Sequence, residues 1–480
     1  MAKNYLYNLL LTLSNLLFPI LSFPYISRIL GPEGVGKVQF VFSFAQYFAL
    51  IAGFGIPIYG MREIARYHND KQGRSMVFSE LITIYVLTSI CLTALYIAVI
   101  YLFPYFRIDR EMYKAAILLV LLGCSYVEWV YTGLEEFKSI ALRSVAFKII
   151  GLLLMFLFIR DAADYSFYLY LIMFSYLGNN ILSLILLRNK IGFVTRGMRL
   201  KRHITPLLFI FGSTIAASMY ADSDTILLGF LSDSKSVGLY TAAVKLSKIS
   251  IPIVTSMGVI LIPKIAKEFA EKNLAEVQLI LNQTFRFVVF FGVPIGFGLV
   301  LLAPEFITLF SGKAFLEATN SMRILSLLPL IIGFAHILLF MILVPSGRNK
   351  EMFVCVMGGL ITCLVLNFLL IPPFQQIGSS IANICSEIVV TLLYIYFINK
   401  NFSFSYQWSL LPKAIASALV FIPVIWVEKH IALPLAIKLA VSISVCALFY
   451  VAVQYILFKN NFVFEVVDVM KTKFNKTVKE

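Results

Sequence analysis

Charge is scarce in this sequence, and acidic charge is the scarcest. Only 14% of the 480 residues are charged and 25 of them are Asp or Glu, whereas 60% are hydrophobic. Globular proteins are usually nearer to half apolar and one quarter charged. A chain of this length could not bury so much apolar surface in a soluble core, so the composition excludes an ordinary water-soluble protein.

Metal ligands and catalytic patterns are sparse as well. The chain has four histidines and six cysteines, and no two cysteines form a C-x-x-C pair. The cysteines are therefore predicted to be small apolar packing residues rather than parts of a disulfide framework, and the few histidines disfavour a zinc site. There is also no nucleophile elbow and no long loop rich in acidic, Arg or His residues. We therefore expect a protein that is not an enzyme, with no catalytic residue, metal or organic cofactor.

Apolar stretches dominate what is present. Windows of about 20 apolar residues, the length that crosses a bilayer as a helix, follow one another along the chain. They predict an all-α integral membrane protein with about 14 transmembrane helices. The predicted spans are 5–27, 38–60, 76–103, 113–133, 140–159, 166–187, 205–230, 237–262, 282–303, 319–345, 352–371, 376–398, 412–430 and 434–457.

Basic residues gather in alternate loops between these spans. The richer loops lie at 62–74, 138–148, 188–202, 264–272 and 348–350, and Lys148 is counted among these loop cations. Cytoplasmic loops are enriched in Lys and Arg, so the pattern predicts a multi-pass protein with both termini on the cytoplasmic side. The same rule explains the net charge of +15 without a nucleic-acid partner.

The chain repeats itself in outline. Residues 30–66 and 228–267 share a Leu-Gly pair, a Val-Gly pair, an apolar stretch and a basic turn. The step from the Val-Gly glycine to the isoleucine of the basic turn is 28 residues in the first copy and 27 in the second. A duplicated membrane protein with an even number of spans per copy predicts parallel repeats and a transport site between the two halves.

The repeat and the loops together predict four regions. An N-terminal six-helix bundle occupies 1–187, and a C-terminal six-helix bundle occupies 205–400. Between them, residues 188–204 form a basic cytoplasmic linker, which suits contact with anionic membrane lipids because 188–203 contains no acidic residue. Residues 401–480 hold two extra helices and a cytoplasmic tail.

Three cations are predicted to line the central cavity. Lys245 and Lys248 lie in the span 237–262, about 12–17 Å from its outer end at 1.5 Å per residue. They are three residues apart and so share a helical face. Charges at that depth are costly and usually functional. Arg28, at the end of the first span, is the third cation. A structural ion pair for the lysines and an interfacial anchor for Arg28 are the alternatives.

Four carboxylates and a histidine inside the spans are candidates for ion coupling or for polar cavity walls. Asp222 and Asp224 are two residues apart, so both cannot face one side of a regular helix. Glu387 and Glu128 lie deep in their spans. Each carboxylate suits a coupling H⁺ or Na⁺, or equally a static salt bridge with a lysine. His336 suits a proton site, although a polar packing role is favoured.

Three segments resemble the bacterial polysaccharide (O-antigen-type) flippases. They are Phe23–Gly36, Asp224–Gly229 followed by Val237–Leu246, and Glu128-Trp129 followed by Gly133–Lys138. The resemblance implies a MATE-like fold with two six-helix bundles and two added helices. It also implies that the protein moves undecaprenyl-diphosphate-linked oligosaccharide from the inner to the outer leaflet of the cytoplasmic membrane by alternating access.

The resemblance and the cavity cations agree in chemistry, because a diphosphate needs fixed positive charge in a low-dielectric cavity. Its partners would be the lipid-linked oligosaccharide, membrane lipids and other glycan-assembly membrane proteins. Three alternatives remain open. A lipid II-type flippase shares the Ser-Arg-apolar-Leu-Gly pattern at 27–31. An ion-coupled multidrug exporter on the same fold would need an acidic or aromatic cavity, and a membrane glycan polymerase would need a catalytic loop.

Overall fold

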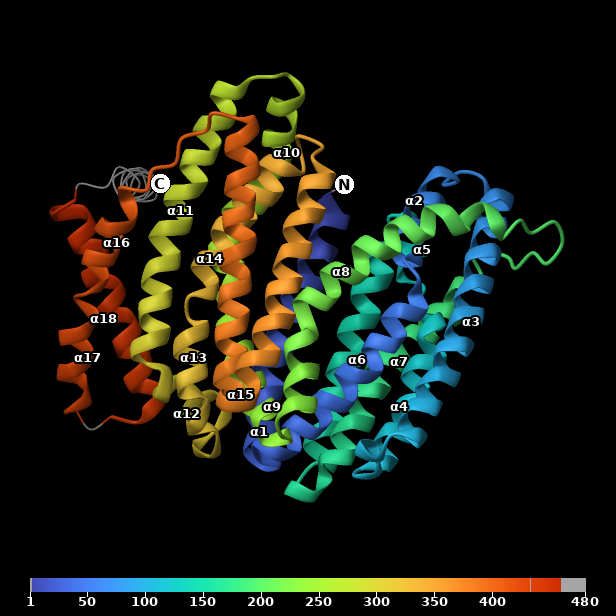
Figure 1. The fold of residues 1–480 in the computed structure, drawn as a ribbon, viewed down its shortest axis with the longest axis horizontal. Coiled ribbons are helices and arrows are strands. Elements are labelled where there is room, and N and C mark those ends of the chain that lie inside the picture. Colours follow the sequence, from blue (N-terminus) through green and yellow to red (C-terminus); the bar gives the residue numbers. More distant parts are fainter. Residues whose placement is uncertain (1, 432, 459–480) are drawn as a thin grey trace, which may run out of the picture. The chain divides into compact units, whose positions relative to one another are not determined.

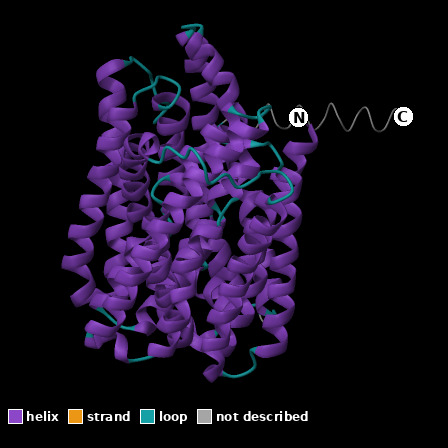
Figure 2. Ribbon diagram, turned by 90° about the vertical axis from the view of Figure 1, so that its right-hand side faces the viewer, coloured by secondary structure: helices purple, strands orange, loops and turns teal. Residues whose placement is uncertain are grey.

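The computed structural model describes residues 2–431 and 433–458, apart from the side chains of residues 2–6, 8, 213, 217, 221, 222 and 429. Helices make up almost all of the described chain, which contains no strand (Figure 2). The chain divides into two compact units between Gly238 and Leu239. The predicted limits 1–187, 188–204, 205–400 and 401–480 stay predictions, and the predicted tail beyond residue 458 lies outside the described residues.

The first unit holds the elements up to α8 and the start of α9. They are α1 (Ala2–Gly53), α2 (Ile56–Arg66), α3 (Lys71–Leu102), η1 (Pro104–Arg107), α4 (Arg110–Leu121), η2 (Leu122–Ser125), α5 (Glu128–Gly133), α6 (Phe137–Phe158), η3 (Ala162–Asp164), α7 (Tyr165–Leu187) and α8 (Lys201–Leu231).

The second unit begins within α9 (Ser234–Ile249). It continues with α10 (Ile251–Ala270), α11 (Leu274–Leu301), α12 (Ala303–Ser311), η4 (Lys313–Ala318), α13 (Thr319–Leu325), α14 (Leu328–His336), the π-helix η5 (Ile337–Leu343), α15 (Asn349–Asn401), α16 (Leu410–Ala418), α17 (Phe421–Lys429) and α18 (Leu435–Ile456).

The predicted all-α membrane architecture is confirmed. Among the described residues, 11 helices are long and apolar enough to cross a membrane, or up to 12 if the bent pair α9–α10 forms one span. The predicted count of about 14 is not confirmed. One reason is that the predicted pairs 5–27 with 38–60 and 352–371 with 376–398 are each counted within one long helical element, α1 or α15, although 38–60 also runs beyond the end of α1 at Gly53.

Both of these long elements contain a backbone break. α1 breaks at Gly31, whose φ of 66° and ψ of 179° are reached without strain by glycine. Figure 1 shows the dark blue start of α1 running down to its label and a lighter blue limb returning upward. α15 breaks at Gln375. There the Ser379 Oγ donates to the Asn367 Oδ1 at 3.0 Å, whereas 12 residues of straight helix would span about 18 Å. α15 is therefore a helical hairpin.

The two repeated turns meet through their glycines. A Cβ on Gly36 would lie 1.7 Å from the Ser234 carbonyl oxygen, and a Cβ on Gly238 would lie 1.8 Å from the Pro32 carbonyl oxygen. Real Cβ atoms essentially never approach so closely, so main chain packs directly on main chain here. The close contact thus gives a structural reason for the glycine of each Val-Gly pair that marks the sequence repeat.

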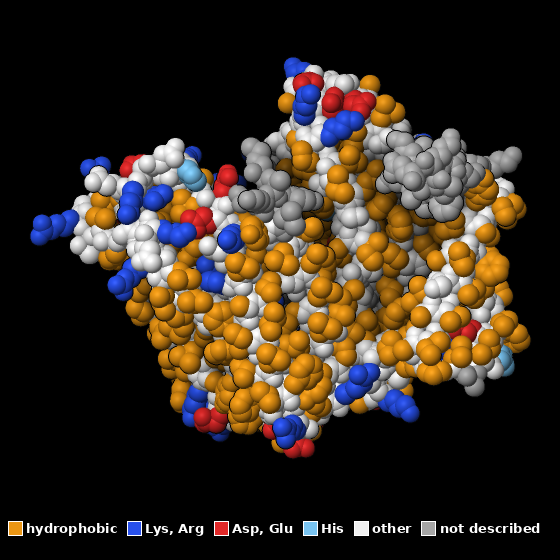
Figure 3. Space-filling view, turned by 180° about the vertical axis from the view of Figure 1, so that it is seen from behind, with side chains coloured by type: hydrophobic (Ala, Val, Ile, Leu, Met, Phe, Trp, Pro, Cys, Tyr) orange, Lys and Arg blue, Asp and Glu red, His pale blue; other side chains and the backbone are white. Residues whose placement is uncertain are grey.

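Charged and apolar side chains separate along the helices. Figure 3 shows Lys, Arg, Asp and Glu gathered toward the helix ends, with hydrophobic side chains covering the stretch between. Leu153, Leu157 and Leu448 are among the exposed ones, at 58%, 58% and 71%. In water such exposure would be unfavourable, whereas hydrocarbon is the matching solvent for it.

Candidate functional site

Lys245 and Lys248 occupy the last two turns of α9. Lys245 is half-buried and Lys248 is exposed. The helix axis bends by 41° between α9 and α10, directly after Lys248. A cation in a last helical turn is stabilised by the partial negative charge of the carbonyl end. The bend thus offers Lys248 a structural role beside the predicted one, and the cavity roles of both lysines stay predictions.

Arg28 and Asp224 lie in the first unit. Arg28 is exposed on α1, three residues before the break at Gly31, and Asp224 on α8 is only 2% exposed. Each interacts with other groups of the protein. The side chain of Asp222 is outside the described part of the chain. The roles assigned to these three residues stay predictions.

Glu387 and His336 lie in the second unit. Glu387 is half-buried on the second limb of the α15 hairpin and interacts with its surroundings. His336 ends α14 where the chain changes to the π-helix η5, and its ring lies 4.8 Å from the ring of Phe340. A Cβ on Gly258 of α10 would meet the His336 Nδ1 at 2.9 Å, so the imidazole packs directly on that helix. Their roles in ion coupling also stay predictions.

Glu128 and Lys148 are brought together in the first unit. Asn179 Nδ2 of α7 donates to Glu128 Oε1 at 3.1 Å. The Lys148 ammonium of α6 donates to Ser14 Oγ at 3.1 Å and, more closely, to Asn15 Oδ1. Glu128 and Lys148 also interact electrostatically. A cavity of about 250 Å³ is lined by Lys148, Asn179 and mainly apolar and hydroxyl-bearing side chains.

The expectation that Lys148 lies in a cytoplasmic loop is wrong. It is the twelfth residue of the 22-residue helix α6, which makes it a mid-helix cation. From the sequence, Lys148 is assigned to a loop because several cations follow one another from residue 138 onward. The apolar run on both sides of Lys148, within 145–158, is the signal that could have found it.

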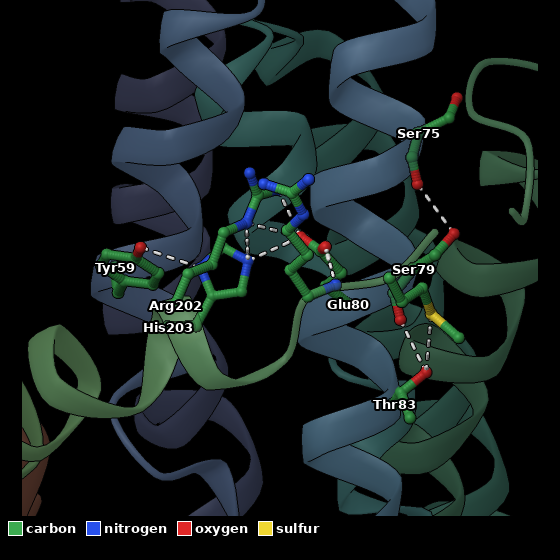
Figure 4. Close-up of polar contacts among 9 residues, drawn as sticks. Tyr59, Ser75, Ser79, Glu80, Thr83, Arg202 and His203 are labelled. Carbon is green, nitrogen blue, oxygen red and sulfur yellow. Dashed lines mark hydrogen bonds and ion pairs between the residues drawn. The ribbon is translucent and has the colours of Figure 1, made fainter. Parts of the chain in front are cut away.

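A second charged cluster, within the first unit, joins the connector before α8 and the start of α8 to α2 and α3 (Figure 4). The Glu80 carboxylate of α3 is 1% exposed. It accepts hydrogen bonds from the Arg199 backbone N–H at 2.6 Å and from Arg202 Nε at 3.0 Å, and it pairs with the second Arg202 nitrogen. His203 Nε2 lies 2.8 Å from the same carboxylate. On the other side of the ring, His203 Nδ1 lies 2.9 Å from the Tyr59 hydroxyl of α2.

Neighbouring serines of α3 extend this attachment. Ser75 Oγ accepts from the Gly192 N–H at 3.0 Å, and Ser79 Oγ accepts from the Val194 N–H at 2.8 Å. Serines four residues apart share a helix face, so α3 presents a row of acceptors to an irregular backbone that lacks partners of its own. The connector is therefore fixed to α3 rather than loosely tethered. Sequence alone could not find this cluster, because Glu80 and His203 are 123 residues apart.

An apolar groove of about 430 Å³ lies in the second unit. α9 and α10 contribute Leu246 and Ile253, α11 contributes Phe291 and Gly298, and α18 contributes Tyr450, with further lining from α12 and α17. Nearly every lining side chain is hydrophobic. A groove of this kind binds hydrocarbon rather than polar ligands, because it offers almost no hydrogen-bonding groups.

Two family models match the chain. One is described as polysaccharide biosynthesis protein and matches residues 1–269, and the other, lipid II flippase MurJ, matches residues 170–436. Two relatives are described as candidate O-antigen transporters. The protein from Shigella dysenteriae is 25% identical over 82% of this chain and 98% of its own length, and that from Escherichia coli K12 is 24% identical over 84% and 97%.

Solved structures with the same fold come from two kinds of transporter. The lipid II flippase MurJ in its inward closed conformation has a TM-score of 0.75 and 16% identity, covering 96% of this chain and 100% of that one. A multidrug resistance MATE family transporter of the MOP superfamily, in an inward-facing conformation, has a TM-score of 0.61 and 16% identity, covering 80% and 94%. At these identities the likeness concerns the fold, which confirms the predicted MATE-like architecture.

Proposed function

Because the chain belongs to the polysaccharide biosynthesis protein family and is a multi-pass membrane protein with the fold of MOP-superfamily transporters, we propose that it is a flippase for lipid-linked oligosaccharide. It would move the oligosaccharide from the inner to the outer leaflet of the bacterial cytoplasmic membrane by alternating access. The observation that carries the proposal is its match to two candidate O-antigen transporters over 97–98% of their length.

The substrate class that suits the chain is an undecaprenyl-diphosphate carrier bearing the sugar. A diphosphate in a water-poor cavity needs fixed cations, and Lys245, Lys248 and Arg28 are those we propose for this role. The apolar groove of the second unit supports the same substrate class, because a polyprenyl tail is a pure hydrocarbon. Its volume of about 430 Å³ is within the range of ordinary ligand sites.

The sidedness of the protein also belongs to the proposal. The cation-rich loops favour cytoplasmic N- and C-termini, with membrane lipids as contacts of the basic linker. Association with other glycan-assembly membrane proteins is part of the same proposal. Fusions of a reporter that is active on only one side of the membrane, placed at each terminus, test this orientation.

Transport also needs a driving force. A carrier without net energy input only equilibrates its substrate between leaflets, so net export requires a coupled ion gradient or removal of the product outside. H⁺ and Na⁺ are the two candidate coupling ions. The carboxylates Asp222, Asp224, Glu387 and Glu128, with His336, are the residues proposed for such coupling.

Two experiments test the function and the role of the lysines. Deleting the gene should remove surface glycan and cause lipid-linked precursor to accumulate. Replacing both lysines, Lys245→Ala with Lys248→Ala, should abolish glycan export while the protein stays in the membrane at its normal level. The matched control is Lys264→Ala, which removes a cation from an exposed ion pair with Glu276. Normal glycan in the double variant would remove the two lysines from the mechanism.

A lipid II-type flippase is the second candidate. The match of the MurJ family model to residues 170–436 favours it, and so does the TM-score of 0.75. The discriminating experiment is expression in a strain depleted of its own lipid II flippase. Growth rescue would favour lipid II as substrate, and failure together with restored glycan in the deletion strain would favour the oligosaccharide. Export of cationic dyes would instead favour the multidrug alternative.

A further inference from the structure

Glu128 is a carboxylate inside the first unit with an uncharged direct partner. Glu128 is the first residue of α5 and is half-buried. At 1.5 Å per residue it lies about 8 Å from the other end of this helix, at Gly133. It accepts a hydrogen bond from the neutral Asn179 amide at 3.1 Å. An amide donor stabilises either protonation state of the carboxyl group, because one oxygen can accept in both.

Lys148 supplies the compensating charge from a distance. It lies 11 residues into α6, about 16 Å from the helix start at Phe137. Its ammonium is bonded to Ser14 and Asn15 of α1 rather than directly to Glu128, with which it interacts electrostatically. The carboxylate is thus attracted by a positive charge without being locked into a contact ion pair.

Room for water lies beside Lys148 and beside the hydrogen-bond donor to Glu128. Lys148 and Asn179, the hydrogen-bond donor to Glu128, both line the cavity of about 250 Å³. One water needs roughly 30 Å³ of liquid volume and two to four polar partners. Ser22, Ser144 and Ser175 provide hydroxyl groups on the same wall. The cavity can therefore hold the short water chain that proton movement requires.

We propose that Glu128 is a proton-binding site of this protein, with Lys148 as the residue that sets its charge environment. A proton leaves a hydronium ion or water in the cavity and adds to a carboxylate oxygen of Glu128, giving the neutral acid, and it returns to water on release. Lys148 stays an ammonium throughout. The pair then alternates between zero net charge and one positive charge. The inference rests on the proposed flippase function and assigns H⁺ as its coupling ion.

The same geometry disfavours a metal cation. Na⁺ beside Glu128 would be repelled by the Lys148 ammonium, and the repulsion is strong in a low-dielectric interior. A proton needs only one carboxylate oxygen, which Glu128 supplies, and nearby water, for which the cavity beside Asn179 has room.

Other groups around Glu128 are neutral or distant from its carboxylate. Tyr126 and Tyr176 lie within electrostatic reach of Glu128. Arg143 of α6 faces α5 but lies over the Tyr131 ring, 4.4 Å from its centre. α2 and α5 contact each other at uncharged residues. Gly60 of α2 packs against the Trp129 ring of α5, so closely that a Cβ on Gly60 would touch the ring. Lys148 is therefore the cation whose removal should act most directly on Glu128.

Infrared difference spectroscopy tests the site without any substrate. The full-length protein in lipid nanodiscs is stepped through pH, and the carbonyl stretch of a protonated carboxylic acid is recorded. We expect a band that Glu128→Gln removes. Lys148→Met should move the midpoint of that band to higher pH, because the ionised carboxylate loses its attraction to the ammonium.

The matched control is Glu111→Gln, the same substitution at a carboxylate whose side chain is 79% exposed in an ion pair with Lys114. It should leave the band unchanged. Should Glu128→Gln fail to fold, Glu128→Asp replaces it, and the band must then shift. An unchanged band in a folded Glu128 variant overturns the proposal. So does a signal at Glu128 that follows Na⁺ concentration at fixed pH and ignores protons.

Glycan export separates this inference from the proposed function. If deletion of the gene leaves surface glycan intact, the flippase proposal fails, whereas the infrared titration remains interpretable. If the wild type restores export but Glu128→Gln restores it equally well at normal membrane abundance, the coupling role fails and the flippase proposal stands. We expect Glu128→Gln to reduce export at least about tenfold, equivalent to 1.4 kcal/mol, and Glu111→Gln to leave it unchanged.

Discussion

The two units of this protein use their interiors differently. The first contains interacting charges, with Glu80 bound by Arg202 and His203, and Glu128 in electrostatic interaction with Lys148. The second unit offers an apolar groove and joins the limbs of its α15 hairpin by a neutral hydrogen bond between Ser379 and Asn367. Buried charges suit the binding of ions, whereas an apolar groove suits hydrocarbon. The two units therefore differ in the chemistry of these particular sites, although the second unit also contains Lys245, Lys248 and the buried Glu428, which do not line the groove.

The strongest test of this contrast is removal of a charge from the first unit. Glu80→Gln should lower the free energy of unfolding by about 2 kcal/mol or more, because it removes the charged acceptor of the buried His203 and of Arg202, whose side chain is 43% exposed. Thermal unfolding of the purified protein in detergent measures the effect. Glu136→Gln, which breaks a more exposed ion pair with Lys190, should cost no more than about 1 kcal/mol. Equal losses in the two variants would contradict the contrast.

Filling the groove of the second unit should affect transport more than stability. Gly298 lines the groove, and a Cβ there would have nothing within 4 Å. Gly298→Leu should therefore fold normally and reduce export of lipid-linked glycan by at least about fivefold, or 1 kcal/mol of lost binding. Leu448→Trp adds bulk to an exposed position of α18 and should leave export unchanged. Full export with Gly298→Leu would remove the groove from the transport path.

The smallest effect is expected at the neutral hydrogen bond. Ser379→Ala should lower the free energy of unfolding by about 1 kcal/mol, since a hydrogen bond between uncharged groups contributes little beyond the contacts that remain. The same thermal unfolding assay compares it directly with Glu80→Gln. A loss as large as that of Glu80→Gln would mean that the α15 hairpin depends on this single bond.

Much of the architecture follows from the sequence, and the reason is physical. A bilayer demands apolar helices of a fixed length, so the helical class and most spans can be predicted from composition alone. The sequence also indicates the turn at Gly31, because a proline follows this glycine directly. The number of spans is less predictable, because an element that turns back at Gly31 or Gln375 counts as one span or two according to its local backbone geometry.

The polar sites are less predictable. The sequence places Lys148 in a loop because cations crowd the start of α6, although the helix carries it to its middle. The Glu80 cluster requires tertiary structure, since its partners Arg199, Arg202 and His203 follow it by more than 100 residues. Glu128 is a candidate already in the sequence, whereas its neighbour Lys148 and its donor Asn179 emerge only with the packing of α5, α6 and α7.

The glycine contact between the repeated turns has a consequence for how this chain tolerates change. Because Gly36 touches the main chain at Ser234 and Gly238 touches it at Pro32, no side chain separates the turns. A methyl group at either position must displace backbone, and shrinking a neighbour cannot make room. A library of random variants should therefore return glycine at both positions.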